Sequence, residues 1–453
     1  MPISAKQMAQ QPLPDGIGAW QNRQVGGNSN PDNRLTTFPA LVDSVFTPSS
    51  MPDMGNTRNW FADVSENRRR RFLASQRDGV AIDVNGHALI NFASNDYLGL
   101  STHPAVCMAA QGACANAVGS GASRLVSGDD PMLHRLEAKL ADWKGYEACL
   151  IVGSGMLANL GLLQALADRH THIFADKLNH ASLVDGARLS GAKTHRYAHL
   201  DAAFLEKQLH QYPAEKRIIV SDGVFSMDGD CADLSTLMAL AEAHDTLLLI
   251  DDAHGTGTLG ENGKGLTTVH HIAGHARLIE VGTFGKAFGS YGAFILGTHE
   301  LIEGLRQRQR TMIYSTALPP AMIAAAETAL LLIQRGEQLK QLHRNLVHFK
   351  AGVLKLGFTA SDTAIQPLVI GEDADALAMS ARLVEHGFFV SAIRPPTVPE
   401  GTARLRFTLS AVHSIEQIDQ LIACLSLMHD TQRESKTFAT NDTNEHELKT
   451  KIL

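Results

Sequence analysis

The stretch RIIVSDGVFSMDGDCADLSTLMALAEAHDTLLLIDDAH (217–254) contains a complete strand–helix–strand unit. Its short apolar runs RIIV and LLLI predict buried strands, because such runs between turn residues suit a sheet covered on both faces. The segment DLSTLMALAEAHD between them has the length and apolar spacing of a helix. Two strands joined by a helix run parallel, so this stretch predicts a parallel sheet covered by helices.

The same alternation extends in both directions along the chain. MLHRLEAKLADWKG (132–145) has helical spacing of its apolar residues, as has HASLVDGARLS (180–190). Further strands are predicted at ACLIV, THIFAD, ARLIEVG and AFILG (148–152, 171–176, 276–282 and 293–297). We therefore predict an α/β fold whose large domain, over 106–335, has a mostly parallel sheet flanked by helices.

A different pattern begins near residue 335. EQLKQLHRNLVHFKAGVLKLG (337–357) predicts one long helix. Separate strands are predicted at IQPLVIG, FFVSAIRPP and ARLRFTLS (365–371, 388–396 and 403–410), with a helix at DALAMSARLVEHG (375–387). This pattern indicates a smaller α+β domain over 336–429, to which we expect the segment 59–105 to contribute.

Both ends of the chain are polar. Residues 1–58 are rich in Gln, Asn, Pro, Gly and Ser, and residues 430–453 are polar as well. Neither segment shows a sustained apolar period, so we predict a disordered N-terminal arm and a loose C-terminal tail.

The composition of the chain argues against some classes of binding partner. The net charge is −7, from 40 basic and 47 acidic residues, which argues against nucleic acid or a membrane surface as the main partner. No apolar run is long enough for a membrane span, and the N-terminus lacks the layout of a secretory signal. The five cysteines are scattered without a Cys-x-x-Cys pair, so neither a zinc site nor a disulfide framework is indicated. A reducing cytoplasm fits this pattern best.

Polar side chains follow the predicted strands where ligands of parallel sheets bind, at the C-terminal ends. Asp251, Asp252 and His254 follow LLLI, and Lys286 follows the next strand, within TFGKAFGSYGAF (283–294). Alone, Lys286 is an ordinary solvated loop lysine. Together with Asp251, it suits pyridoxal phosphate, because a lysine amine forms a Schiff base with this cofactor and a carboxylate keeps its ring nitrogen protonated.

The phosphate of such a cofactor needs hydroxyl and backbone N–H donors. Thr283 lies just before the lysine, and Ser226 follows another apolar strand. The GSGM turn (153–156) leads into a predicted helix whose N-terminus favours an anion.

Two other interpretations use some of the same residues. Asp251, Asp252 and His254 offer metal ligands, but further ligands have no obvious source. LIVGSGMLANL (150–160) contains a Gly-x-Gly-x-x-Ala pattern, with Asp176 at the end of the next strand, as in dinucleotide-binding folds. That interpretation leaves Lys286 and Asp251 without a role.

Several motifs together resemble the α-oxoamine synthases, a fold-type I family that depends on pyridoxal phosphate. They are NFASNDYLGLSTHP, GSGASRLVSG, DKLNHASLVDG, GVFSMDGD, DDAHGTGTLG and TFGKAFGSYGA, and the resemblance covers about 65–428. It implies a homodimer with shared active sites and a transferase that condenses an amino acid with an acyl thioester, with loss of CO₂. IRPPTVPEGTARLRFTLSA (393–411) most resembles the biotin-pathway branch, which implies L-alanine and pimeloyl-CoA or a pimeloyl-acyl carrier protein as substrates.

The resemblance also implies roles for individual residues. Lys286 would hold the cofactor and move protons, Asp251 would pair with the ring nitrogen, His254 would contact the phenolic oxygen, and His180 would stack on the ring. Further cofactor contacts would come from Gly155, Met156, Ser226 and Thr283, and from Ser315 and Thr316 of the other subunit. Substrate contacts would come from Arg69, one of the four arginines 68–71, and from Asn95, His180, Arg394 and Thr397, with Arg394 binding the amino-acid carboxylate. The chain departs from the family at Asp222, where a glutamate is usual.

Three alternatives stay open. A related synthase could use glycine or serine with another acyl thioester. A non-catalytic partner subunit could share the fold, although it would have no use for Lys286, Asp251 and His180. A nicotinamide oxidoreductase is the third, and no metal is expected.

Overall fold

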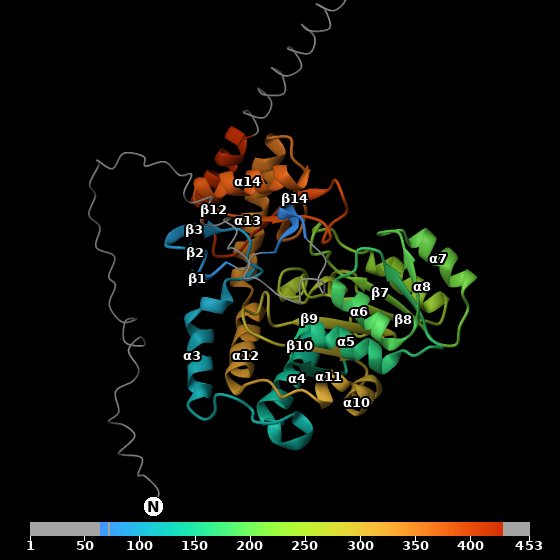
Figure 1. Cartoon of the computed structure of the whole chain (residues 1–453). Helices are drawn as coiled ribbons and strands as arrows, with labels where there is room; N and C mark the ends of the chain where they lie inside the picture. The colour runs from blue at the N-terminus through green and yellow to red at the C-terminus, as the bar shows by residue number, and fades with distance from the viewer. Residues whose placement is uncertain (1–63, 71–72, 429–453) are drawn as a thin grey trace, which may run out of the picture.

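The computed structural model describes residues 64–70 and 73–428 (Figure 1). The predicted arm over 1–58 and tail over 430–453 lie outside this part of the chain. Its largest sheet has seven strands in the order β4-β10-β9-β8-β7-β5-β6. They are β4 (Ala148–Val152), β5 (His172–Asp176), β6 (Lys193–Tyr197), β7 (Arg217–Asp222), β8 (Leu247–Asp251), β9 (Leu278–Thr283) and β10 (Ala293–Gly297). All are parallel except β10, which pairs antiparallel with both β9 and β4, so the predicted mostly parallel sheet is confirmed.

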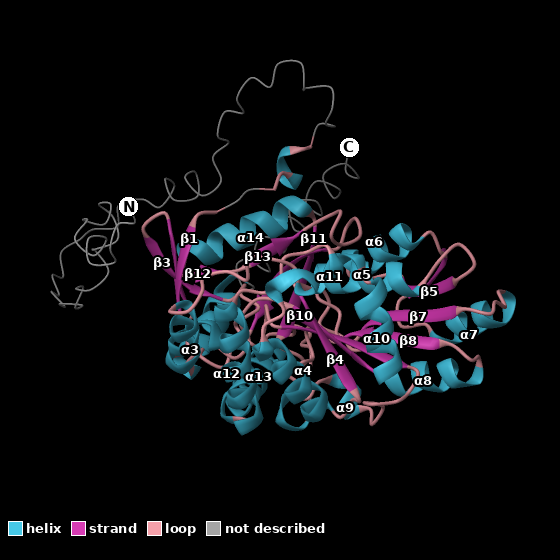
Figure 2. Ribbon diagram, turned by 90° about the horizontal axis from the view of Figure 1, so that it is seen from below, coloured by secondary structure: helices cyan, strands magenta, loops and turns pink. Residues whose placement is uncertain are grey.

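Helices cover both faces of this sheet (Figure 2). Because side chains alternate along a strand, each strand supplies two apolar clusters. In β8, Leu248 and Ile250 face one cluster and Leu249 faces the other. The helices are α4 (Pro131–Lys144), α5 (Gly155–Leu166), α6 (Ala181–Ser190), α7 (Ala202–Gln211), α8 (Leu234–Ala243), α10 (His299–Arg308), α11 (Arg310–Ile313) and α12 (Pro320–Arg335). The first cluster includes side chains of α4, α7, α8 and α12, and the second includes those of α5, α6, α10 and α11.

Two smaller sheets lie together above the large one in Figure 1. The first has the order β1 (Ser75–Asp78), β2 (Ala81–Val84), β3 (His87–Asn91), β12 (Phe388–Phe389). The second has the order β11 (Ile365–Gly371), β14 (Ala403–Thr408), β13 (Ser391–Ile393). The long helix α13 (Glu337–Lys355), α14 (Asp373–Glu385) and a helix described over 415–428 belong to this part. The pairing of β3 with β12 joins the N-terminal segment to the C-terminal one, while the domain boundaries themselves stay a prediction.

The remaining short elements connect these parts. They are η3 (Glu66–Arg68), η4 (Leu100–Thr102), α3 (Pro104–Cys114), the π-helical turn η5 (Arg124–Gly128), η6 (Glu261–Gly263) and α9 (Leu266–Val269). No helix within the described ranges combines the length and apolar character needed to cross a bilayer.

The prediction of one continuous strand over 388–396 was wrong. Phe388 and Phe389 pair with β3, whereas residues from Ser391 pair with β14 in the other sheet. Between them, the carbonyl of Val390 accepts a hydrogen bond from Ser380 Oγ of α14 at 2.7 Å. This side-chain donor satisfies the backbone where the chain changes sheets, which a periodic apolar pattern does not reveal.

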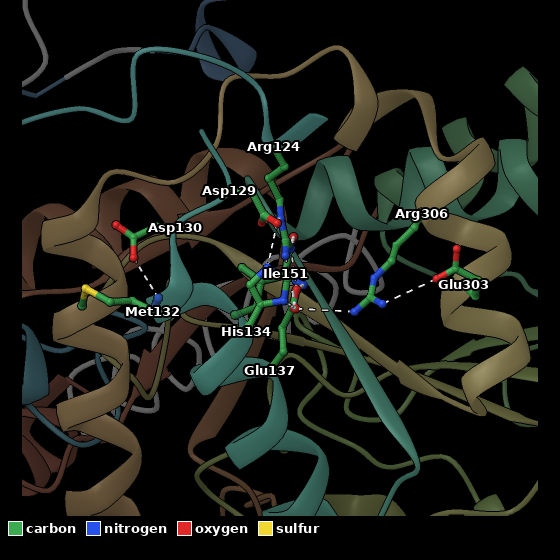
Figure 3. A network of polar contacts seen from close by, with 9 residues as sticks. All are labelled: Arg124, Asp129, Asp130, Met132, His134, Glu137, Ile151, Glu303 and Arg306. Atoms are coloured by element: carbon green, nitrogen blue, oxygen red, sulfur yellow. Dashed lines mark hydrogen bonds and ion pairs between the residues drawn. The ribbon is translucent and has the colours of Figure 1, made fainter. Parts of the chain in front are cut away.

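The edge strand β4 is held by charged side chains (Figure 3). The outward backbone N–H of Ile151 donates to Glu137 Oε1 at 2.8 Å, and its carbonyl accepts from Arg124 at 3.4 Å. Arg124 and Glu137 pair through both guanidinium nitrogens, at 2.5 and 3.2 Å. These contacts satisfy an otherwise unpaired strand edge and fix β4 just before the turn that leads into α5.

A second set of charges lies in the interior between α4, β8 and β9. Lys144 is fully buried, contacts Glu280, and donates to Thr256 Oγ1 at 2.8 Å and to Asp252 Oδ2 at 3.4 Å. Tyr146 donates to the second oxygen of Glu280 at 2.6 Å. Burial lowers the pKa of Lys144 to about 8, although the neighbouring Asp252 favours its charged form.

We predict that Lys144→Met lowers the free energy of unfolding by about 3–5 kcal/mol, because it leaves buried carboxylates without their cation. The matched control, Lys340→Met, removes an exposed lysine of α13 and should change stability by less than about 0.5 kcal/mol. Urea unfolding of both variants measures the difference. Equal stability of the two variants would show that the interior carboxylates do not depend on Lys144.

Candidate active site

The site is built at the C-terminal edge of the large sheet. Asp222 at the end of β7 and Asp251 at the end of β8 are direct register partners, and both are buried. Asp251 accepts a hydrogen bond from Asn159 Nδ2 at 2.6 Å and one from the backbone N–H of Ala253 at 3.0 Å. Asn159 also donates to Ser182 Oγ at 2.9 Å, so α5 and α6 together fix the Asp251 carboxylate.

Lys286 lies beyond the end of β9, the strand next to β8. Removal from water lowers the pKa of its amine to about 8, against the opposing effect of the carboxylates of Asp251 and Asp222. Within the described residues, its Nζ has no hydrogen-bond partner. The site therefore holds an amine that is partly neutral and free to react, which is the requirement for a Schiff base.

His254 forms a second part of the site. Its Nδ1 lies 2.6 Å from the hydroxyl of Tyr97. Burial, together with the charges of Lys286 and Arg406, holds the pKa of His254 well below its usual range, so its ring is neutral. Burial raises the pKa of Tyr97 to about 12, so this hydroxyl keeps its proton.

His180 stands at the N-cap of α6, where its Nδ1 accepts from the N–H of Ser182 at 3.2 Å. Its own backbone N–H donates to Asp222 Oδ2 at 2.7 Å. Desolvation is the main cause of a pKa below the ordinary histidine value, although the residue keeps an exposed surface. This arrangement leaves a neutral ring face available for stacking.

Asp222 stands where the resemblance implies a glutamate, and its carboxylate accepts a hydrogen bond from the backbone N–H of His180. Burial and the neighbouring Asp251 raise the pKa of Asp222 well above its usual range. Burial and the neighbouring carboxylate therefore favour the protonated form of Asp222.

The predicted phosphate-binding residues surround the same edge. Gly155 and Met156 form the first turn of α5, whose N-terminal N–H groups have no partner inside the helix. Ser226 lies in the loop after β7. Thr283 ends β9, donates to the carbonyl of Gly292 at 3.0 Å and accepts from the N–H of Gly285 at 3.1 Å, so its hydroxyl also shapes the loop that carries Lys286.

Other predicted residues lie in different surroundings. Ser315 and Thr316 lie between α11 and α12, and Thr316 forms an isolated bridge with Ser123. The role of this pair toward another subunit stays a prediction. Arg69 pairs with Glu66 at 3.2 Å on the surface.

The substrate residues predicted near residue 395 also lie toward the surface. The guanidinium of Arg394 donates to the carbonyl of Asn67. Thr397 is exposed, and its N–H donates to the carbonyl of Arg394 at 3.1 Å.

The sequence analysis missed Arg406, which the structure places among the site residues. It is buried, donates from Nε to the carbonyl of Ser226 at 2.6 Å, and approaches Asn95 Oδ1 with both terminal nitrogens at 3.2 Å. Arg406 belongs to β14, whose residues are all buried, and an arginine within the predicted strand ARLRFTLS was the signal available in the sequence.

His199 was also missed. Its ring bridges two carboxylates, with Nδ1 at 3.0 Å from Asp176 and Nε2 at 2.9 Å from Asp230. Hydrogen bonds to these carboxylates outweigh desolvation and raise the pKa of His199 to about 10. The bridge ties the end of β5 to the loop 223–231, which carries Ser226.

Comparisons with known proteins identify the family of this chain. Residues 87–425 match the aminotransferase class I and II family. An 8-amino-7-oxononanoate synthase from Hydrogenovibrio crunogenus is 46% identical over 84% of this chain and 98% of its own length. Another from Methylococcus capsulatus is 50% identical over 79% of this chain and 94% of its own length.

Solved structures give the same result. A Sphingomonas wittichii serine palmitoyltransferase matches with a TM-score of 0.74 and 31% identity, over 77% of this chain and 89% of its own. An 8-amino-7-oxononanoate synthase from Francisella tularensis matches with a TM-score of 0.67 and 30% identity, over 76% and 99%. A serine palmitoyltransferase from S. paucimobilis with a bound PLP–myriocin aldimine matches with a TM-score of 0.75 and 28% identity, over 79% and 91%.

The fold and the site define a fold-type I transferase, and this chain belongs to the aminotransferase class I and II family. Its similarity to several 8-amino-7-oxononanoate synthases confirms the resemblance to the α-oxoamine synthases.

We predict that His199→Gln lowers the stability of the holoenzyme by about 1–3 kcal/mol near neutral pH, since hydrogen bonds to charged groups contribute that much. Because the folded-state pKa is raised from 6.5 to about 10, the stabilisation is full below pH 6.5 and is lost as the pH rises through about 10. Urea unfolding of both proteins across this range measures the difference. A stability difference that stays constant with pH would contradict the charged bridge.

Proposed function

We propose that this chain condenses L-alanine with a pimeloyl thioester, carried by coenzyme A or an acyl carrier protein. The products are 8-amino-7-oxononanoate, CO₂ and the free thiol, as in biotin biosynthesis. The observation that carries the proposal is the joint placement of Lys286, Asp251 and His180 at one sheet edge, in a chain 44–50% identical to 8-amino-7-oxononanoate synthases.

The residues present fit pyridoxal phosphate. Lys286 supplies an amine with no hydrogen-bond partner among the described residues, and Asp251 supplies a fixed carboxylate. In the first turn of α5, the N–H groups of Gly155 and Met156 have no partner among the described residues and are available to a phosphate, whereas that of Leu157 donates to Ser154 Oγ. When bound, this cofactor supplies an electron-accepting ring that stabilises negative charge on the α-carbon of the amino acid.

Asn159 and Ala253 orient the carboxylate of Asp251, which would pair with the ring nitrogen of the bound cofactor and favour its protonated form. His180, whose backbone N–H donates to Asp222, would stack on one face of the cofactor ring. His254, whose ring is oriented by its hydrogen bond with Tyr97, would contact the phenolic oxygen of the cofactor. Ser226 and Thr283 complete the cofactor contacts.

Lys286 is the proton carrier. Its low pKa makes it a competent base for the α-proton of the amino acid, and it returns a proton to the same carbon after CO₂ is lost. His180 or His254 donates a hydrogen bond to the new carbonyl group during decarboxylation. Water exclusion follows from the buried setting of the carboxylates and of Tyr97.

Arg406 is the better placed of the two candidate arginines for the amino-acid carboxylate. It is buried beside Ser226 and Asn95, and a bound carboxylate would replace Asn95 Oδ1, which now accepts from both terminal nitrogens of the guanidinium. Arg394, the residue predicted for this role, instead donates to the backbone of Asn67. Asn95, Arg69 and Thr397 remain proposed substrate contacts.

We further propose a cytoplasmic homodimer, in which Ser315 and Thr316 contact the phosphate in the other subunit. The serine palmitoyltransferases among the structural matches favour serine as the alternative amino acid, at 28–31% identity. The visible absorption spectrum of purified protein, recorded before and after L-alanine, glycine or L-serine, separates these possibilities. A visible band that responds to L-alanine supports the proposal. A response only to glycine or serine would show that the amino-acid substrate is not L-alanine. The absence of a visible band after addition of pyridoxal phosphate would contradict the proposed cofactor.

Lys286→Ala is expected to reduce turnover at least about 1,000-fold, because both the covalent attachment and the base are lost. Far-UV circular dichroism should show the fold intact, since Lys286 makes no hydrogen bond within the described residues. Lys340→Ala, which removes an exposed lysine of α13, is the matched control and should keep full activity. Normal turnover by Lys286→Ala would refute the scheme.

Arg406→Lys is expected to raise the KM for the amino acid about 10-fold or more, because lysine cannot reproduce a two-nitrogen contact. The KM for the acyl thioester should change little. Arg394→Lys is the matched comparison, and steady-state kinetics with each substrate varied separately measures both variants. A larger effect of Arg394→Lys on the KM for the amino acid would show that Arg394, and not Arg406, binds the amino-acid carboxylate.

A further inference from the structure

Two imidazoles and a carboxylate lie close together at the C-terminal ends of α7 and α8, near the N-terminal edge of the large sheet. Glu206 and His210 are four residues apart on α7, so their side chains lie on the same face of that helix. His244 follows directly after α8, which packs beside α7 (Figure 1). One ligand atom of each of these three side chains lies within 4.8 Å of the others.

The geometry points to a binding site for a late first-row divalent cation, such as Zn²⁺, Ni²⁺ or Co²⁺, at Glu206, His210 and His244. We propose that these residues bind the cation as a His₂Glu set, with water at the remaining positions. Imidazole and carboxylate ligands suit this group of metals, and a site with three protein ligands is complete with one water in tetrahedral geometry.

Backbone contacts hold His244 in place before any ion binds. Its N–H donates to the carbonyl of Leu240 at 3.1 Å, and its own carbonyl accepts from the guanidinium of Arg217. The rings of His244 and His210 already approach edge to face, with centroids 4.6 Å apart.

The helix ends add a favourable field. His210 lies in the last turn of α7, and His244 is the C-cap of α8. The C-terminus of a helix carries partial negative charge, so both helices favour a cation at this point. The positive charge of Arg217 opposes the binding of a cation. This charge limits the affinity for the metal ion, so the carboxylate of Glu206 is needed for charge balance.

To bind one ion, the ligand atoms of Glu206, His210 and His244 must move closer together than the 4.8 Å within which they now lie. Bonds of about 2.0–2.2 Å in a tetrahedral set place ligand atoms roughly 3.4 Å apart. Glu206 and His210 are exposed, so rotation of their side chains supplies the remaining approach without disturbing the core.

This site is separate from the active site. His244 lies just before β8 begins, at the N-terminal edge of the sheet, whereas Asp251 lies at the C-terminal end of the same strand. A bound ion would clip α7 to α8 and stabilise the folded chain by mass action. The inference does not depend on the proposed reaction.

Equilibrium dialysis of untagged, chelator-washed holoenzyme against ZnCl₂ tests the proposal. We expect one Zn²⁺ per chain, and a rise in melting temperature that depends on Zn²⁺. His210→Ala, His244→Ala and Glu206→Gln should each weaken binding at least about 10-fold, because even the loss of groups outside the ligand shell costs that much. Substitution with Co²⁺ should give a visible d–d spectrum that disappears in the histidine variants.

The matched control is His386→Ala. His386 is also an exposed histidine at a helix C-cap, in α14, but it is absent from any three-ligand group among the described residues. This variant should bind Zn²⁺ as the parent does. Binding that is unchanged in all three ligand variants, or absent in the parent, would overturn the proposal.

Discussion

The parallel register of β7, β8 and β9 is the constraint on which this site depends. It sets Asp222 directly opposite Asp251 and sets Asp251 opposite Val281, so that the loop after β9 emerges beside both carboxylates. Two carboxylates on adjacent strands cannot both be charged without a large electrostatic cost in a buried setting. Burial and the charge of Asp251 raise the pKa of Asp222 well above its usual range, while the nearby amine of Lys286 opposes that rise.

Asp252, the residue that directly follows β8, lies in a different environment from Asp251. Asp251 points to Asn159 of α5, whereas Asp252 reaches Lys144 of α4, because successive side chains leave a strand on opposite faces. Each of the two carboxylates therefore has a polar partner on its own face of the sheet, Asn159 for Asp251 and Lys144 for Asp252. Lys144 is therefore engaged by Asp252 and Glu280 rather than by Asp251.

Much of this was accessible from the sequence because it is local. An apolar run followed by acidic residues places Asp251 at a strand end, and the family motifs assign Lys286, His180 and His254. The contacts of Arg406 and Asn159 were not accessible, since Arg406 meets Asn95 across 311 positions of sequence and Asn159 meets Asp251 across 92. No spacing rule links such pairs. The division of residues 388–393 between two sheets was missed for the same reason, because strand partners are set by tertiary packing.

Arg406 also determines how the parts of the proposed site act together. Through Ser226 it holds the loop after β7, and through Asn95 it holds the segment before α3, while its own strand belongs to a smaller sheet. The neighbouring Arg404 adds an ion pair with Asp228 of the same loop. An amino-acid carboxylate bound at Arg406 would therefore be positioned relative to the cofactor by three separate chain segments. Its displacement by even a small distance would misalign the α-proton with Lys286, so amino-acid choice and reaction geometry are set by the same contacts.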